Sequence, residues 1–390
     1  MSKRILVMDA HAVGMLGVIR SLGRAGYSVT ACATSGRALG LHSHYAQDVA
    51  VHPPYSSGDF ASWLEDYISE RRIDMIVPSE GFLHAVRDCY ERFVPLLPDA
   101  VPKYVWEGCM SKVDSDAILR AHPDGAYNLP FSAVLTGAHE LEALESSLQS
   151  EASPFYVKGD AGKGLGKVGK AVVRRCLSIA ETLDAVAELL PNYQAVICQG
   201  HAPGRKVGVS LWRHRGEFRA ESMTLGIHMN PFHGGMMSLR ETFWHQSLLE
   251  DAKRKMELLG WEGVAMMEYK WDPDSDRFWF IEINARYWGY LHLDLYAGKD
   301  FPRLQADAFF GSIGSALGPP PQGIRCRYLF PADIGHVLSL LRSDESRWSD
   351  RLRTIFEFVL WSLNPRCHAD LWFPRDRAVY WRAAFDFFRR

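Results

Sequence analysis

The chain has 390 residues, which exceeds the usual size of a single hydrophobic core and predicts two or three domains. Hydrophobic residues make up 47% of it and charged residues 23%, so there is enough apolar surface to build folded cores, and a disordered chain is excluded. The formal charge of −2 provides no basic field for phosphate backbones. This excludes nucleic acid as the main partner and favours small molecules.

The cysteines and the N-terminal residues indicate the compartment. The 7 cysteines are odd in number and scattered, without a CxxC pair, and are typical of reduced thiols. The first residues, MSKRILVMDA, enter an apolar run directly and lack the features of a signal peptide. The apolar run at 355–363 is far shorter than the roughly 20 residues needed to cross a bilayer. We therefore expect a cytoplasmic protein without a transmembrane segment.

Strand and helix patterns alternate over residues 1–108. Strands are expected at 5–8, 27–31 and 74–78, and helices at 14–22, 60–70 and 81–90. This order predicts a small doubly wound α/β sheet whose loops carry a ligand. The turn after the first strand, from Asp9 to Gly14, lacks the GxGxxG spacing of a dinucleotide site.

From about residue 109 the pattern changes to α+β. A helical pattern runs over 112–144 with a break at Leu129-Pro130. Further strands are expected at 155–158, 195–199, 207–212, 218–224, 264–271 and 278–283, and helices at 177–190 and 243–259. The Gly-Pro-rich linker 318–323 then leads into an extension rich in Trp, Phe and Arg.

A glycine-rich stretch follows the strand that carries Lys158, and it includes Gly162, Lys163, Gly164 and Gly166. Glycine lets backbone N–H groups approach phosphate oxygens closely, and the lysines add positive charge. The stretch therefore predicts a flap over a nucleotide. The alternative is an ordinary flexible hairpin, since the ending typical of a P-loop is absent.

Two carboxylates lie in consecutive apolar strands joined by a turn. If the two strands pair as a hairpin, Glu268 and Glu282 can point to one face a few ångströms apart. Asn284 and Arg286 follow Glu282 at intervals of two and keep its face. Oxygen ligands at this spacing suit Mg²⁺ bridging two phosphates, and the arginine suits a phosphate or a carboxylate. The alternative is a solvated polar face of an amphipathic hairpin.

The hairpin continues into a motif that resembles a known family. Residues 282–289, EINARYWG, resemble the E-I-N-P-R-F-W-G motif of the ATP-grasp superfamily, in particular its carboxylate-amine ligase branch related to the carbamoyl phosphate synthetase large chain. Ser111-Lys112, the strand at 154–158 and the segment at 196–204 resemble further parts of the same fold. Residues 20–27 and 43–45 resemble its pre-ATP-grasp domain, so the resemblance covers about residues 3–310.

The resemblance implies both an architecture and a site. It implies a Rossmann-like pre-ATP-grasp domain at 1–108, an ATP-grasp domain at 109–317 with a small lobe at 109–198 and a large lobe at 199–317, and a C-terminal helical extension at 318–390. The implied cofactors are ATP and Mg²⁺, with Mn²⁺ as a substitute. ATP would be bound by Lys112, Lys158, Gln199, Gly200 and the glycine flap, and the metal by Glu268, Glu282 and Asn284, while Arg286 and Lys158 would act in catalysis.

Several other residues allow two interpretations. His228, His233 and Arg240 could contact substrate or phosphate, or belong to an ordinary loop. His11 and the segment 42–44 could line a pocket, although partly buried structural histidines are expected. Residues 347–390 carry nine arginines and five acidic residues, with apolar positions at helical spacing. We expect this segment to pack on the core or form a homodimer contact, and peripheral membrane binding or another partner is the alternative.

The expected function is an ATP-dependent carboxylate-amine ligase, which forms an amide bond through an acyl phosphate and releases ADP and phosphate. Its substrates would be a small carboxylic acid and an amine, with an amino acid as one of them. One alternative activates bicarbonate or uses a thiol or hydroxyl acceptor. Another is a sensor or scaffold that binds ATP without turnover. The sequence does not name the two substrates, because loop residues outside the nucleotide motifs choose them.

Overall fold

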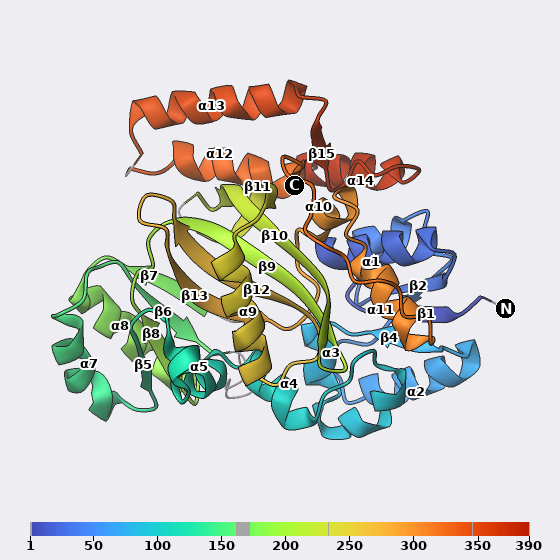
Figure 1. Ribbon diagram of the computed structural model, residues 1–390, viewed down its shortest axis with the longest axis horizontal. Helices are drawn as coiled ribbons and strands as arrows, with labels where there is room; N and C mark the ends of the chain where they lie inside the picture. Colours follow the sequence, from blue (N-terminus) through green and yellow to red (C-terminus); the bar gives the residue numbers. More distant parts are fainter. Residues whose placement is uncertain (1, 161–171, 233, 345, 390) are drawn as a thin grey trace.

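The computed structural model describes residues 2–160, 172–232, 234–344 and 346–389. Figure 1 shows an N-terminal α/β region in blue, a small lobe in green, a large central sheet in yellow and brown, and a C-terminal segment in red along one edge. The expected mixture of α/β and α+β architecture is confirmed.

The N-terminal region is built on a parallel four-stranded sheet with strand order β3-β2-β1-β4. The expected βαβ unit is present, but strand β3 was missed because it is a short edge strand with two exposed residues. The helix expected over 81–90 ends at Ala85 and continues as a 3₁₀ turn. The elements are β1 (Arg4–Val7), α1 (Val13–Arg24), β2 (Ser28–Ala33), β3 (Asp48–Val51), α2 (Phe60–Arg71), β4 (Met75–Val77), α3 (Glu80–Ala85) and α4 (Lys103–Met110).

The small lobe is an antiparallel sheet with strand order β5-β8-β6-β7, covered by helices. Its elements are α5 (Lys112–Arg120), α6 (Pro123–Ala126), β5 (Ser132–Leu135), α7 (Leu141–Leu148), β6 (Phe155–Gly159), β7 (Val172–Cys176), α8 (Ile179–Leu189) and β8 (Val196–Gln199). The prediction of helix throughout 112–144 was wrong at β5. This segment forms a strand because it pairs with β8. The register runs from Ser132 opposite Gln199 to Leu135 opposite Val196.

The large lobe is a seven-stranded sheet with strand order β13-β12-β9-β10-β11-β14-β15. Its elements are β9 (Arg205–His214), β10 (Glu217–Asn230), β11 (Met236–Phe243), α9 (Gln246–Leu258), β12 (Gly263–Asp272), β13 (Arg277–Asn284), α10 (Leu291–Tyr296), α11 (Phe301–Phe309), β14 (Arg325–Arg327) and β15 (Cys367–Ala369). Strand β11 was not predicted. Pairing with β10 on one side and β14 on the other makes it an inner strand.

The C-terminal extension contains the expected helices, α12 (Ile334–Leu341), α13 (Trp348–Leu363) and α14 (Arg377–Phe388). It also supplies strands β14 and β15 to the large sheet. Buried ion pairs fix part of it to the body: Arg20 of α1 lies 2.7 Å from Asp376, and Arg240 of β11 pairs with Asp370.

Hydrophobic packing joins some regions and separates another. The N-terminal region and the large lobe share clusters, in which Leu6 and Phe60 belong with Val209 and Met267. The strands of the small lobe have a core of their own around Phe155. A separate core lets a lobe move as a unit. The division of the chain at residues 108 and 317 stays a prediction.

Candidate nucleotide and metal site

The predicted hairpin brings the two carboxylates together. Strands β12 and β13 are antiparallel, with Glu268 directly opposite Glu282 and Met266 opposite Asn284. Asn284 donates a hydrogen bond to Glu282 over 3.2 Å, so the amide lies beside that carboxylate. Both carboxylates are mostly buried but open to solvent, with side chains 12% and 22% exposed.

Three lysines from three strands or helices surround the carboxylates. Lys112, the first residue of α5, binds the carboxylate of Glu282. Lys206 on β9 lies 2.7 Å from the carboxylate of Glu268. Lys158 on β6 donates a hydrogen bond to the side-chain oxygen of Gln199 over 2.6 Å. The predicted site residues of the two lobes therefore meet at one place.

Burial and charge set the protonation of this cluster. Burial, together with the positive charge of Lys112, lowers the pKa of Lys158 to about 8. Burial disfavours the charged form of Glu282 as well, but the charges of Lys112 and Lys158 outweigh it and lower the pKa of this carboxyl. The cluster thus holds an ionised carboxylate among basic groups, which suits a ligand that carries both phosphates and a cation.

Two neighbouring cavities meet at the cluster, and Lys112 and Glu282 line both of them. One has partly apolar walls, and it also contains Lys158 and Gln199. Its apolar lining residues are Leu129, Ile197, Phe280 and Ile281. The other is polar and is lined by Glu80, Asp160, Asn284 and Arg286 among others.

Arg286 stands at the far side of the polar cavity and joins two regions. Its guanidinium donates to Asn284 over 3.0 Å and to Glu80 of α3, in the N-terminal region, also over 3.0 Å. The arginine keeps the face of Glu282, as expected from the alternation. The N-terminal region therefore contributes a carboxylate to the site.

Known proteins are similar to this chain over part of its length. No protein-family model matches the chain. It is 23% identical over 245 residues to acetyl-CoA carboxylase 2 of Oryza sativa subsp. japonica, which covers 61% of this chain and 10% of that protein. It is 24% identical over 150 residues to carbamoyl-phosphate synthase of Methanobrevibacter smithii, covering 37% of this chain and 38% of that one. The chain thus spans well under half the length of these curated relatives.

Solved structures match more of the chain. An L-amino acid ligase from Bacillus licheniformis has a TM-score of 0.59 at 15% identity, over 82% of this chain and 75% of that one. A biotin carboxylase from Campylobacter jejuni, in a β,γ-ATP complex, has a TM-score of 0.62 at 16% identity. This match covers 83% of this chain and 74% of that one. A third match is the biotin carboxylase domain of the 2-oxoglutarate carboxylase of Hydrogenobacter thermophilus, in complex with MgADP, ADP and bicarbonate. Its TM-score is 0.61 at 16% identity, and the match covers 80% of this chain and 71% of that one.

The chain has the ATP-grasp fold. In this ATP-grasp chain the cluster of Lys112, Lys158, Glu268 and Glu282 lies where the small and large lobes face each other. Gly200, predicted to help hold the base, donates its N–H to Phe131 over 2.8 Å. Gly162, Lys163, Gly164 and Gly166 lie outside the described residues. The individual binding roles stay predictions.

The donor set fits Mg²⁺ that is shared with phosphates. Glu268, Glu282 and Asn284 offer hard oxygen ligands on neighbouring strands. Among the described residues, no group of three or more His, Cys, Asp and Glu side chains could hold a metal ion. Two carboxylates are nevertheless the usual protein share for Mg²⁺, because substrate phosphates supply the other ligands. Lys112 and Lys206 would compete with the ion for the same carboxylate oxygens.

Three residues of this site were not predicted from the sequence. Lys206 lies near the start of β9, and only the strand pairing places it beside Glu268. Asp160 accepts hydrogen bonds from the Ser111 hydroxyl over 2.7 Å and from the backbone N–H of Val113 over 3.1 Å, at the start of α5. Glu80 is the first residue of α3, shortly after β4 and so at the carboxyl end of a parallel strand. The sequence predicted a ligand at the loops of this sheet, but it did not identify a residue that would contact the ligand.

Among the described residues, His11, His42, His228 and Arg240 do not line the two cavities at the cluster. His228 and Arg240 are buried in β10 and β11, where they pair with Asp333 and Asp370 of the extension, so the loop interpretation was wrong. His233 lies outside the described residues. His11 is exposed beside Asp9 at 3.8 Å. His42 is partly buried, as expected of a structural histidine.

Proposed function

We propose that this chain is an ATP-dependent ligase that phosphorylates a substrate carboxylate with ATP and transfers the acyl group to an amine. One observation carries the proposal: Glu268 and Glu282 face each other across a hairpin and are surrounded by Lys112, Lys158 and Lys206. Carboxylates for a divalent cation and lysines for phosphates are the parts that phosphoryl transfer requires.

The chemistry rests on positioning and charge. In this proposal Lys112 and Lys158 hold phosphate oxygens, and Arg286 orients the attacking carboxylate and balances charge on the transferring phosphoryl group. Glu268 and Glu282 would hold Mg²⁺, which would supply positive charge to neutralise the phosphates. The substrate carboxylate attacks the γ-phosphorus, ADP leaves, and the amine then displaces phosphate from the acyl carbon. Closure of the small lobe would keep water from the acyl phosphate.

Glu80 supports an amine as the acceptor. Its carboxylate lines the polar cavity beside Arg286, and its side chain is 40% exposed. A carboxylate next to an arginine can hold an ammonium group and a carboxylate of one substrate, or of two neighbouring ones. Bicarbonate carries no ammonium group, so it would not use the carboxylate of Glu80 in this way. An amino acid as one substrate accords with this pairing.

The test measures ADP and phosphate release from Mg-ATP across a matrix of carboxylic acids and amines, with mass spectrometry of active mixtures. We expect release that requires both an acid and an amine and yields an amide. Glu282→Gln should abolish it, whereas Glu257→Gln, at an exposed glutamate of α9, should not. Release with bicarbonate alone would favour the carboxylase alternative, AMP and pyrophosphate would refute the acyl phosphate, and Mg-ATP binding without turnover would favour a sensor.

Glu80→Gln tests the amine assignment separately. The variant should raise the KM for the amine at least about 10-fold, because it removes the charged partner of an ammonium group. The KM for ATP should stay unchanged. A rise in both constants would assign Glu80 to the general structure of the site instead.

A further inference from the structure

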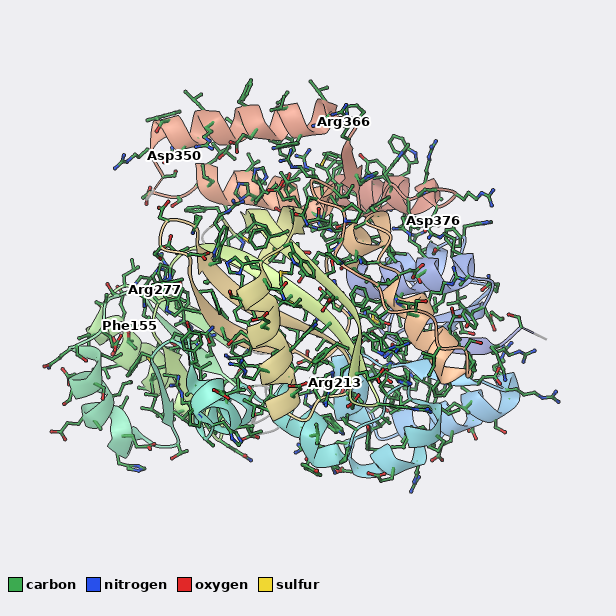
Figure 2. All side chains as sticks on the ribbon, in the orientation of Figure 1. Phe155, Arg213, Arg277, Asp350, Arg366 and Asp376 are labelled. Atoms are coloured by element: carbon green, nitrogen blue, oxygen red, sulfur yellow. The ribbon has the colours of Figure 1, made fainter. Side chains whose placement is uncertain are left out.

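Helix α13 presents its apolar side chains away from the protein. Trp348, Phe356 and Leu363 have 74%, 67% and 77% of their surface exposed. The other exposed apolar residues of the helix are Leu352, Ile355, Val359 and Leu360. Their spacing places all seven on one stripe of the helix. Figure 2 shows side chains projecting from α13 on its outer side, between the labelled Asp350 and Arg366.

The opposite side of α13 attaches the helix to the body. Thr354 is buried on this side, and Arg327 of β14 lies 4.2 Å from the centre of the Phe358 ring. Arg325 lies in the same way 4.5 Å from the Trp361 ring. An ordinary surface helix turns its apolar stripe to the core and its polar side to water. Here the arrangement is reversed. The extension packs on the body in part, as expected, but the apolar stripe of α13 faces outward, and the homodimer contact stays a prediction.

Helix α14 continues the same apolar surface. Trp381, Phe385 and Phe388 are exposed at helical spacing, while Val379 and Ala383 face the body. A groove joins the two helices, because Trp361 and Ser362 of α13 line it together with Tyr380 and Trp381 of α14. Both helices lie along the same edge of the molecule in Figure 1. We call this joint surface the apolar edge.

The apolar edge is surrounded by positive charge. Among the described residues from 342 to 389, the acidic residues with well-exposed side chains are Asp344, Asp350 and Asp386. The exposed arginines there are Arg342, Arg347, Arg353, Arg366, Arg375, Arg377, Arg382 and Arg389. Tryptophan and arginine around an apolar stripe are typical of helices that lie in the interface of an anionic membrane.

We infer that the apolar edge docks the protein onto an anionic lipid surface, with α13 and α14 lying in the plane of the interface. The arginines would meet lipid phosphates, and the apolar side chains would enter the headgroup and acyl boundary by about 5–10 Å. A second copy of the chain is a poorer occupant, because two such edges in contact would place both sets of arginines against each other.

The mode of binding is peripheral. No helix among the described residues is long and apolar enough to cross a membrane. Helix α13, with 16 residues, is about 24 Å long and is apolar on one side only. Such a helix binds by buried apolar area together with attraction to anionic lipid, so its binding weakens with salt.

The test is cosedimentation of the full chain with vesicles of equal parts phosphatidylglycerol and phosphatidylcholine, compared with phosphatidylcholine alone. We expect binding to the anionic vesicles that salt weakens. The double variant Phe356→Ser, Leu363→Ser should lose at least about 10-fold in apparent affinity. Arg366→Gln with Arg375→Gln should lose about 5-fold per residue.

Matched controls separate this role from general effects. Tyr104→Ser removes an apolar side chain that is 76% exposed on α4, and Arg92→Gln removes an exposed arginine of the N-terminal region. Both should bind vesicles like the wild type, and all variants should keep its thermal midpoint. Absence of wild-type binding, or equal binding by Phe356→Ser, Leu363→Ser, would overturn the inference. So would a solution dimer that this variant dissociates without any vesicle binding.

Discussion

Two sets of ion pairs in this protein each join a basic side chain to a carboxylate, but they differ in their exposure to solvent. In the cleft, Lys112 pairs with Glu282 and Lys206 with Glu268, and these side chains are 12–26% exposed. At the junction with the extension, Arg240 pairs with Asp370, and neither side chain is exposed at all. Lys112 and Glu282 of the first set line both cavities of the cleft, whereas the second set is enclosed by the fold.

The difference shows what distinguishes an ion pair of a binding site from one that only stabilises the fold. It is the access of a ligand to the pair, and not the type of residue. A pair at the edge of a cavity can exchange its partner for a phosphate or a cation, because water and ligand can replace it. A fully buried pair cannot, since separating the charges leaves one without a partner in a poorly polar interior. The four predictions below, from the largest expected effect to the smallest, test this distinction.

The largest effect is expected at the junction. Asp370→Ala leaves the buried guanidinium of Arg240 without its partner, so the free energy of unfolding should fall by about 3–5 kcal/mol. Urea unfolding followed by circular dichroism measures this. Adding Arg240→Met should restore part of the loss, because the unpaired charge is gone. If the single variant were as stable as the wild type, the junction pair would not be structural.

In the cleft the effect should fall on activity. Glu268→Gln should lower kcat for ADP release at least about 100-fold, because it removes one of two carboxylates available to Mg²⁺. Its unfolding free energy should change much less than that of Asp370→Ala. Kinetics at saturating Mg-ATP and urea unfolding on the same samples make the comparison. If Glu268→Gln lowered the free energy of unfolding as much as Asp370→Ala does, the proposed distinction between binding and structural ion pairs would be wrong.

Acid should reduce the stabilisation that the buried carboxylate of Asp333 gives to the junction with the extension. This tests the structural role of the buried pairs in a second way. Burial opposes ionisation of Asp333, but the hydrogen bond with His228 and the charge of Arg327 outweigh it and lower its pKa from 3.8 to about 2. A lowered folded-state pKa stabilises the fold above pH 3.8, by about 2 kcal/mol, and this is lost as pH falls toward 2. The gap in unfolding free energy between wild type and Asp333→Asn should therefore narrow over this range. A constant gap would contradict the assignment.

The smallest effect is expected where both partners face water. Arg174 lies 2.6 Å from Glu188 on the surface of the small lobe, with side chains 46% and 61% exposed. Arg174→Ala should change the free energy of unfolding by less than about 1 kcal/mol, because water and salt screen the pair. Thermal unfolding at low and high salt checks this. A larger loss would show that the short distance, and not exposure, sets the strength of the pair.

Much of the fold followed from local patterns. The βαβ unit around α1 and the hairpin of Glu268 and Glu282 were predicted because alternation and helical spacing appear within a few residues. Strand β5 was not, since its partner lies far away in the chain. Strand β11 was not predicted either, and it pairs with the preceding strand β10 as well as with the distant β14. Strand β5 pairs with β8 about sixty residues later, and no local pattern contains that information.

The sequence by itself determined the two carboxylates, the amide and the arginine on one face of a hairpin, because a strand repeats every two residues. It also determined which lysines precede the helix and the glycine stretch. Only the tertiary structure brought Lys206 and Glu80 to that site, enclosed Arg240 with Asp370, and turned the apolar stripe of α13 outward. Periodicity fixes which residues share a face, but the direction of that face depends on contacts between distant segments.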